Sequence, residues 1–337
     1  MLTAESVKKM AKSLGADAVG IGNIERWEGA PIQMDPRQIM PEAKSVISMA
    51  FRVMRGSLRG IEEGTFFSNY SAMGYGGLTY LYMPLVVIDL SGYIEDHGYE
   101  AFPMGHQSDW RGIDNEGKVK GVSRPVAEGR AAPDVMVHQR IAGYLCGLGE
   151  IGYSKVFLTP QFGPRQRLGI VITEAELEPD PIYDGPKLCN KCMACVRECP
   201  GNAIPARETV KVTLAGNEVE WADLDLEGCA NAFRGAKLEP DPDLPPEKTY
   251  LERQGKKFPA SSITPFRAKP GSLYKTGQAI CGGKGCMRAC MMSLEERGVL
   301  ENKFHSKFRR RKPWSVDWSV TPEEQFARER EEGQAAE

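Results

Sequence analysis

The sequence has no excess of charge of either sign and no long apolar run. Its 337 residues include 43 Lys and Arg against 45 Asp and Glu, a formal net charge of −2. This balance gives no general basic field of the kind that non-specific nucleic-acid binding requires, which argues against nucleic acid as a partner. The best apolar stretch, residues 78–90, is shorter than the ~18 residues of a membrane span and contains Pro84. We therefore expect no membrane-spanning segment.

Export signals are also missing from the N-terminus. Residues 1–22 contain neither a basic start followed by an apolar run nor a twin-arginine pair. We therefore expect a cytoplasmic protein. Cytosolic thiols are kept reduced, so the nine cysteines do not predict a disulfide framework. Metal ligation is the leading explanation for them.

The spacing of apolar residues predicts a mixed chain of helices and strands. Thr3 is suited to cap a first helix that Gly15 ends, and Pro84 either kinks a later helix or marks its true start. The patterns place helices over residues 4–14, 78–97 and 134–146, and strands over residues 16–22, 45–51, 99–102, 156–158 and 167–173. Residues 107–133 are polar and glycine-rich, which predicts a loop or lid.

Four cysteines form a run that is typical of bacterial ferredoxins. Cys189, Cys192, Cys195 and Cys199 are followed by Pro200, in the pattern C-x-x-C-x-x-C-x-x-x-C-P. The first three thiolates of such a run bind one [4Fe–4S] cluster, and the fourth binds the other cluster of a pair. A structural zinc site is the alternative, although zinc usually uses pairs of cysteines separated by a longer loop.

Four further cysteines are spaced less regularly. If the ligand pattern of two-cluster ferredoxins applies, Cys290 completes the first cluster, while Cys199 joins Cys229, Cys281 and Cys286 around a second. A single cluster with scattered buried thiols remains an alternative. Cys146 stands apart at the end of an apolar helix, and we expect it to be a buried small hydrophobe.

Several segments resemble the epoxyqueuosine reductase and reductive dehalogenase superfamily. The stretch CGLGEIGYSKVFLTPQFGPRQRLGIVITEAELEPD, residues 146–180, precedes the ferredoxin-like motif, and KSLGADAVGIG and PEAKSVISMAF resemble the opening of epoxyqueuosine reductases. The resemblance implies an α/β (α+β) fold with a nitroreductase-like cobalamin-binding domain over residues 1–180. It also implies a ferredoxin-like domain with two [4Fe–4S] clusters over residues 181–300. Residues 301–337 would then form a basic, aromatic segment and a charged tail.

The same resemblance suggests where a corrinoid and a catalytic proton donor would lie. Glycines would let the backbone approach the flat macrocycle, and a serine and a lysine would bond its polar groups. The candidate cofactor-binding residues are Gly147, Leu148, Gly149, Gly152, Ser154 and Lys155. A tyrosine beside a basic residue would donate the proton. The candidate catalytic residues are Tyr70, Tyr75, His138 and Arg140.

These residues predict a cobalamin-dependent iron–sulfur oxidoreductase that removes a halide or an oxygen substituent from a small organic substrate. A low-potential donor of the ferredoxin or flavodoxin type would supply electrons. Two features separate the chain from the named activities: Glu150 stands where epoxyqueuosine reductases usually carry an aromatic residue, and no twin-arginine signal is present. Two alternatives therefore stay open. One is an electron-transfer or reductive-activation partner of a separate corrinoid protein, and the other is an epoxyqueuosine reductase acting on tRNA.

Overall fold

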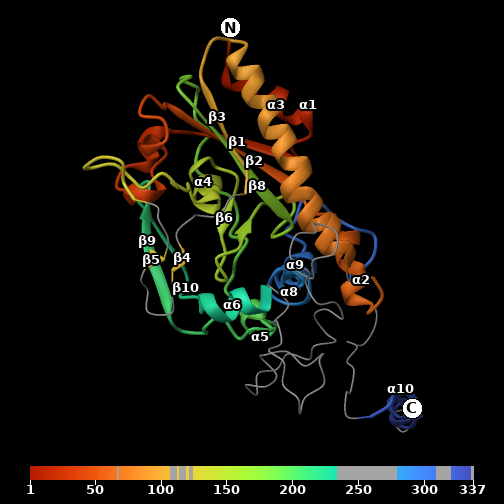
Figure 1. Cartoon of the computed structure of the whole chain (residues 1–337). Coiled ribbons are helices and arrows are strands. Elements are labelled where there is room, and N and C mark those ends of the chain that lie inside the picture. The colour runs from red at the N-terminus through yellow and green to blue at the C-terminus, as the bar shows by residue number, and fades with distance from the viewer. Residues whose placement is uncertain are drawn as a thin grey trace.

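A four-stranded sheet lies at the centre of the N-terminal half (Figure 1). The computed structural model describes residues 1–66, 68–106, 112–113, 119–120, 124–233, 279–308 and 320–334. The strands lie in the order β1 (Ala18–Asn23), β2 (Ser45–Arg52), β8 (Gln166–Thr173) and β3 (Ala101–Met104). Each neighbouring pair is antiparallel. The expected mixture of helix and sheet is confirmed, in its α+β form.

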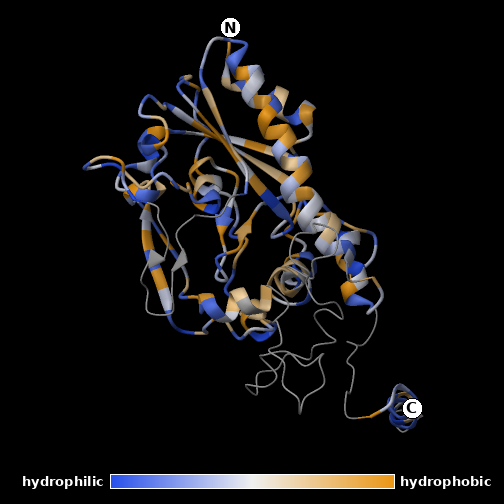
Figure 2. Cartoon of the chain, viewed as in Figure 1, coloured by the Kyte–Doolittle hydropathy of each residue, from blue (hydrophilic) through white to orange (hydrophobic). Residues whose placement is uncertain are grey.

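Two helices cover one face of this sheet. α1 (Ala4–Leu14) and α3 (Met83–Glu95) lie side by side on it, and Figure 2 shows hydrophobic residues concentrated in α3 and the central strands. Successive residues of a strand point to opposite faces. Ile47 and Met49 are therefore buried against these helices, whereas Val46 packs into the core on the other face. Burial on both faces explains why β2 is an almost continuous apolar run.

The first helix begins and ends where the sequence predicts. Thr3 Oγ1 accepts a hydrogen bond of 3.1 Å from the Ser6 backbone N–H, and Gly15 ends the helix with a φ of 122°. These caps are local interactions, so they can be recognised from sequence alone. The strands predicted over residues 16–22, 45–51 and 167–173 are confirmed to within two residues at each end.

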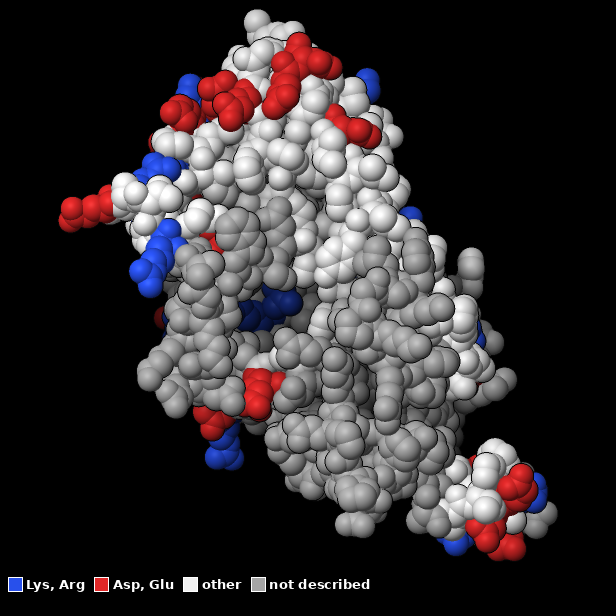
Figure 3. All heavy atoms as spheres, viewed as in Figure 1, with Lys and Arg blue, Asp and Glu red and all other residues white. Residues whose placement is uncertain are grey.

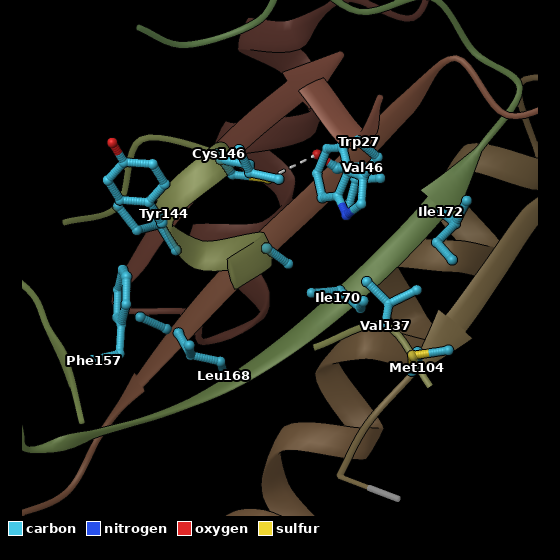
Figure 4. Close-up of a cluster of buried hydrophobic side chains, with 14 of the residues drawn as sticks. Trp27, Val46, Met104, Val137, Tyr144, Cys146, Phe157, Leu168, Ile170 and Ile172 are labelled. Atoms are coloured by element: carbon cyan, nitrogen blue, oxygen red, sulfur yellow. Dashed lines mark hydrogen bonds between the residues drawn. The ribbon is translucent and has the colours of Figure 1, made fainter. Parts of the chain in front are cut away.

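The opposite face of the sheet is covered by α4 (Gln139–Leu145). Figure 4 shows its cluster of buried side chains, in which the Cys146 Sγ donates to the Val46 carbonyl oxygen at 3.2 Å. Burial raises the pKa of Cys146 to about 12, which agrees with the expected inert thiol. The helix is shorter than the predicted 134–146, because the His138 ring caps it by accepting from the Ile141 N–H at 3.4 Å.

A π-helix precedes α3. This helix, η5 (Tyr70–Tyr82), leads directly into α3, and Pro84 stands in the first turn of α3. Of the two alternatives predicted for Pro84, it marks the start of the α-helical part. By length and composition alone, the 26-residue segment Tyr70–Glu95 is able to cross a membrane, which corrects the expectation that no stretch is long enough. One side of it packs on the sheet, while Leu85 and Ile88 are exposed on the other.

The cysteine-bearing segments lie at the end of the molecule opposite the N-terminus (Figure 1). Their helices are α5 (Ala194–Arg197), α6 (Leu226–Phe233), α8 (Ile280–Lys284) and α9 (Cys286–Glu296). The remaining helices are α2 (Arg59–Glu62), α10 (Pro322–Gln334) and the short 3-10 turns Ile24–Trp27, Ile32–Met34, Pro36–Gln38 and Arg55–Leu58. Three hairpins complete the described chain: β4 (Gly112–Ile113) with β5 (Val119–Lys120), β6 (Glu150–Ile151) with β7 (Phe157–Leu158), and β9 (Thr209–Leu214) with β10 (Asn217–Ala222).

Part of the predicted loop over residues 107–133 lies outside the described residues, as do residues 309–319 of the basic, aromatic segment. The chain at residue 180, where the first expected domain ends, is tied to the N-terminal half. Asp180 accepts hydrogen bonds from Lys8 Nζ at 2.7 Å and from the Ile21 N–H at 2.9 Å. This stretch therefore runs along the edge of the first core.

Candidate functional site

Four cysteines from two distant parts of the chain meet at one cavity. Cys189, Cys192 and Cys195 line it together with Cys290 of α9. Burial raises the pKa of Cys290 well above its ordinary value, and the thiolates of the other three raise it further. The structure thus brings together the four residues that were predicted to hold the first cluster.

The other four predicted ligands form a second set. Burial raises the pKa of Cys281 well above its ordinary value, and repulsion from the Cys286, Cys229 and Cys199 thiolates adds to the effect. Cys286 is also close enough to Cys195 of the first set for the Cys195 thiolate to raise its pKa. The two sets are therefore neighbours, and electrons would have a short path from one to the other.

The surroundings of the cysteines fit iron–sulfur clusters. Gathering several thiolates in one buried place is costly unless positive ions neutralise them. Lys191 and Met193 both have left-handed backbone, with φ of 54° and 58°, a geometry that turns successive N–H groups towards an anion. Backbone N–H groups also donate to sulfur, from Tyr153 to Cys189 Sγ and from Ala203 to Cys199 Sγ, both at 3.3 Å. Such bonds tune the reduction potential of a cluster.

A single zinc ion fits less well. Zinc draws its ligands to within about 2.3 Å of one centre. Among the described residues, no three His, Cys, Asp or Glu side chains converge in a way that would hold one metal ion. Each cysteine of a cubane binds a different iron, so a cluster holds its thiolates farther apart.

Glu150 anchors the first cysteine loop. Its carboxylate accepts a short hydrogen bond from the Cys189 backbone N–H. Burial raises the pKa of Glu150, and hydrogen bonds from the Cys189 and Leu188 N–H groups oppose that shift. The residue that sets this chain apart from epoxyqueuosine reductases therefore touches the cluster loop.

The glycines that were assigned to a corrinoid have a packing role. A Cβ on Gly147 would lie 2.1 Å from the Pro181 carbonyl oxygen, and one on Gly149 would lie 2.0 Å from the Leu158 carbonyl oxygen. These two glycines allow close approach of this chain's own backbone. Leu148 is buried in the core beneath α4, and Gly152 packs on the Leu158 side chain. The turn is thus tightly packed on the chain's own backbone, and its assignment to a corrinoid stays a prediction.

The two polar residues of the same block lie elsewhere. Ser154 is buried, and its side chain hydrogen-bonds to Cys195, so it supports the first cysteine set. Lys155 has left-handed backbone, and its ammonium lies 5.0 Å from the centre of the Trp221 ring. Its carbonyl oxygen accepts a hydrogen bond of 2.8 Å from the Arg140 guanidinium.

A recess opens beside the second cysteine set. Arg140 and Cys229 both have exposed side chains, yet burial lowers the pKa of Arg140 and raises that of Cys229. This combination is expected of groups on the floor of a deep hollow, which are accessible but surrounded by protein. The two groups attract each other electrostatically. Figure 3 shows a hollow with basic side chains at its floor.

Two tyrosines of η5 contact a second arginine near this recess, and a third is hydrogen-bonded to one of them. Arg167 donates a hydrogen bond of 3.0 Å to Tyr70 Oη, and its guanidinium lies 5.0 Å from the centre of the Tyr75 ring. Tyr75 Oη shares a hydrogen bond of 2.8 Å with Tyr80 Oη, which lies 3.5 Å from His106 Nδ1. Burial raises the pKa values of Tyr70 and Tyr75, and the charge of Arg167 opposes the shift at both.

Arg167 is the residue that sequence reasoning missed. After burial, the charge of Arg167 also lowers the pKa values of Arg140 and His106. Among the described residues, its buried Nε has no hydrogen-bond partner. A charged residue inside the otherwise apolar strand QRLGIVIT was the available signal, because charged side chains are rare in such strands unless they have a structural or functional role.

His138 is placed less favourably for proton transfer. Its Nδ1 already accepts from the Ile141 N–H at the start of α4. Burial, followed by the charges of Arg140 and Lys155, lowers the pKa of His138 to about 4. The ring is therefore neutral near pH 7, and its Nδ1 contact is the cap at the start of α4.

Relatives of known function match part of the chain. Tetrachloroethene reductive dehalogenases of Desulfitobacterium hafniense and Dehalobacter restrictus are each 30% identical over 138 residues, which cover 40% of this chain and 20% of those proteins. The corresponding enzyme of Sulfurospirillum multivorans is 45% identical over 60 residues, 17% of this chain and 12% of that protein. The matches thus span a fifth or less of the length of these relatives. No protein-family model matches the chain.

Solved structures of similar proteins include a catabolic reductive dehalogenase and two epoxyqueuosine reductases. The dehalogenase is 23% identical with a TM-score of 0.48, over 68% of this chain and 29% of that one. The reductase of Streptococcus thermophilus is 18% identical with a TM-score of 0.42, over 63% and 55% of the two chains. That of Bacillus subtilis is 14% identical with a TM-score of 0.44, over 83% and 70%. The resemblance expected from the motifs is confirmed by the sequence matches: this chain is similar to reductive dehalogenases.

Proposed function

We propose that the protein is a cobalamin-dependent iron–sulfur reductase. In this proposal Cys189, Cys192, Cys195 and Cys290 hold one [4Fe–4S] cluster, and Cys199, Cys229, Cys281 and Cys286 hold another. The observation that carries the proposal is the position of the second set, because Cys229 and the basic floor of the recess attract each other. A cluster there would deliver electrons to whatever occupies the recess. Similarity to oxidoreductases that remove halogen supports the same reading.

A corrinoid is the cofactor that the recess would hold. It would supply a cobalt centre that stores low-potential electrons and reacts with a carbon–halogen or carbon–oxygen bond. The fit rests on two guanidinium groups: the Nε of Arg167 is buried and without a hydrogen-bond partner among the described residues, and Arg140 has an exposed side chain inside the recess. Both can donate to amide or phosphate oxygens of a bound cofactor.

The chain's own residues would bind the substrate and move one proton. Arg140 and Arg167 place two positive charges at the recess, which favours a substrate or leaving group with negative charge. Tyr75 is the candidate acid, since it lies beside Arg167 and is hydrogen-bonded to a second tyrosine. Arg167 opposes the rise in the pKa of Tyr75 and would stabilise its phenolate.

We propose a small organic molecule with a halide or an oxygen substituent as the substrate. Reduction by two electrons and one proton breaks the bond to the substituent, forms a carbon–hydrogen bond and releases a halide or hydroxide ion. The released anion would be attracted to the two arginines. We also propose that residues 1–180, which carry the recess arginines, form the cobalamin-binding domain. Residues 181–300 would form the domain that holds the two clusters.

Cofactor content after purification without oxygen tests the proposal. The protein should contain eight iron and eight sulfide ions per chain, and after incubation with cobalamin and gel filtration it should retain one cobalt. Electron paramagnetic resonance should then detect Co(II) together with reduced clusters. A chain that keeps iron and sulfide but never cobalt would contradict the proposal and favour a partner of a separate corrinoid protein.

Substrate reduction completes the test. Chlorinated ethenes and halogenated phenols are suitable first substrates, with titanium(III) citrate as reductant and halide release as the measured product. A tRNA that contains epoxyqueuosine should remain unchanged. Conversion of that tRNA without dehalogenation would replace the proposed substrate class by the alternative one.

A further inference from the structure

The proposed acid, Tyr75, is shielded from solvent. Only 6% of the residue is exposed. Burial raises the pKa of its hydroxyl, and the hydrogen bond to Tyr80 raises it further. The phenolate that remains after a proton transfer is therefore a strong base, and it has to recover its proton before the next turnover. Because Tyr75 is buried, that proton has to reach it through neighbouring side chains.

A row of hydrogen-bonded groups leads from Tyr75 to an exposed histidine. Tyr75 Oη lies 2.8 Å from Tyr80 Oη, which lies 3.5 Å from His106 Nδ1. The rings pack edge to face, with 5.6 Å between the centres of the two tyrosine rings and 5.5 Å between those of Tyr80 and His106. Tyr80 is half-buried and His106 is exposed. Exposure thus increases at each step from the buried acid to solvent.

The fold holds His106 at the end of this row. The residue follows β3, which pairs with β8, the strand that carries Arg167. At the start of α4, Gln139 Nε2 donates a hydrogen bond of 2.7 Å to the carbonyl oxygen of Gly105, the residue before the histidine. The imidazole also packs edge-on to Tyr75, with 6.4 Å between the ring centres. An exposed ring is therefore fixed against the buried tyrosine cluster.

The groups around the imidazole keep it neutral. Burial lowers the pKa of His106, and the positive charges of Arg167 on β8 and Arg140 on α4 lower it further. On the η5 side the ring faces Tyr75 and Tyr80, which are uncharged when protonated. A neutral imidazole can give a proton from one nitrogen and take one up at the other. The two arginines cannot do this, because a guanidinium keeps its protons in proteins.

We infer that His106 admits solvent protons to the site and that Tyr80 passes them on to Tyr75. The inference rests on the proposed function. Tyr75 gives its hydroxyl proton to the substrate carbon, and Tyr80 gives its own proton to the Tyr75 phenolate. His106 Nδ1 then protonates Tyr80, while Nε2 takes up a proton from solvent. One proton enters for each one delivered, and no electron moves in these steps. The ring returns to its starting tautomer by proton exchange with solvent.

Halide release from the first turnover onwards tests this relay. His106→Ala is compared with His97→Ala, which removes an exposed ring at the end of α3. Each protein, loaded with clusters and cobalamin and reduced in advance by titanium(III) citrate, is mixed rapidly with a chlorinated phenol. His106→Ala should complete its first turnover at the rate of the control, because Tyr75 is protonated at the start. Later turnovers should slow about tenfold, less than the loss of a general acid itself would cause.

Added imidazole separates proton entry from a structural role. It should restore the later turnovers of His106→Ala, because it replaces the missing ring, but not those of Tyr80→Phe, which lacks the middle group. Later turnovers of His106→Ala as fast as those of the control would overturn the inference and leave the proposed function standing. A first turnover that is already slow would also overturn it, because His106 would then only support the packing around Tyr75. Absence of halide release from the parent protein would refute the proposed function instead.

A measurement without substrate checks the contact itself. The chain has four histidines, so nitrogen-15 labelling of histidine gives a simple NMR spectrum of the ring nitrogens in the protein with oxidised clusters. The ring-nitrogen signals of His106 should shift in Tyr80→Phe, because the hydrogen bond at Nδ1 is lost, while those of His97 should stay in place. Unchanged His106 signals would break the row at that step and overturn the inference, whatever the activity of the loaded protein.

Discussion

Tyr75 Oη and Tyr80 Oη share a hydrogen bond of 2.8 Å although the two residues are five positions apart on one helix. In an α-helix, residues five apart point about 140° away from each other around the axis. In a π-helix the backbone bonds join residues five apart, so such residues lie on one side. η5 is a π-helix, and Tyr70 stands a further five residues earlier. The helix type therefore aligns three tyrosines near Arg167.

The placement of Tyr75 beside Arg167 predicts that Tyr75→Phe abolishes most of the reductase activity. The substitution removes the proposed acid but keeps the ring against Arg167, so the fold should be retained. General acids contribute about 10²- to 10⁴-fold to rates, and we expect a loss in that range for dehalogenation with titanium(III) citrate as reductant. Tyr80→Phe removes only the hydrogen-bond partner and should cause a smaller loss.

Tyr99→Phe is the matched control, because this exposed tyrosine lies outside η5. Its turnover and its iron content should equal those of the parent protein. If Tyr75→Phe were as active as that control, with cobalt retained, the proton would have to come from another group.

Local and distant interactions differ in how well the sequence reports them. Thr3 and Gly15 reveal α1 because caps depend on neighbouring residues, and the ferredoxin spacing groups the cysteines of the first set. The packing of Gly147 against the Pro181 carbonyl oxygen depends on residues far apart in the sequence, so the sequence alone does not report it. Tyr70 and Tyr75 were candidates by residue type, but an α-helical period of 3.6 residues would place them on different sides of a helix, so the sequence did not reveal their common partner, Arg167.

The cysteines provide a second prediction. Cys286→Ser should lower the iron content by about half, because one ligand of the second cluster is lost while the first set is intact. Cys146→Ala is the control: its thiol is buried under α4 and bonded to the Val46 carbonyl oxygen, away from both sets. We expect full iron content in that control and a modest loss of stability, about 1 kcal/mol, from the lost hydrogen bond. Iron, sulfide and the visible absorbance of each protein measure the outcome.

An unchanged iron content in Cys286→Ser would remove this residue from the ligand set. Loss of all iron would instead indicate that the two clusters assemble as one unit. Cys192→Ser distinguishes these cases, because its exposed side chain belongs to the first set and its loss should leave the second cluster in place.

A buried ion pair between α2 and α9 gives a third prediction. Two guanidinium nitrogens of Arg288 donate to the Glu62 carboxylate, one of them at 2.9 Å, and the two side chains are only 2% and 6% exposed. Arg288 lies between two proposed cluster ligands on α9. Glu62→Gln leaves a buried charge without its partner, and removing one partner of such a pair costs about 3–5 kcal/mol.

Unfolding in urea under anaerobic conditions measures this loss. The double variant Glu62→Leu/Arg288→Met should be less destabilised than Glu62→Gln, because no unpaired charge remains in the interior. Arg59→Gln removes the exposed i,i+4 pair with Glu63 on the same helix and should change stability by less than about 1 kcal/mol. If Glu62→Gln and Arg59→Gln lowered the free energy of unfolding equally, the buried ion pair would stabilise the fold no more than the exposed one.

His138 makes stability depend on pH in a defined direction. Burial and the charges of Arg140 and Lys155 lower its pKa in the folded state to about 4, against 6.5 for the ordinary group. The folded state therefore disfavours the protonated ring, and the unfolded state takes up a proton first as the pH falls. The stability that comes from the neutral ring is complete above pH 6.5 and is lost between pH 6.5 and about 4.

His138→Asn keeps a side-chain acceptor at the start of α4 but cannot be protonated, so its urea midpoint should decline less than that of the parent over this range. His97→Asn, on an exposed ring at the end of α3, is the control and should follow the parent. Parallel declines in all three proteins would mean that the acid sensitivity arises elsewhere, and the placement of His138 beside two positive charges would then have no energetic consequence.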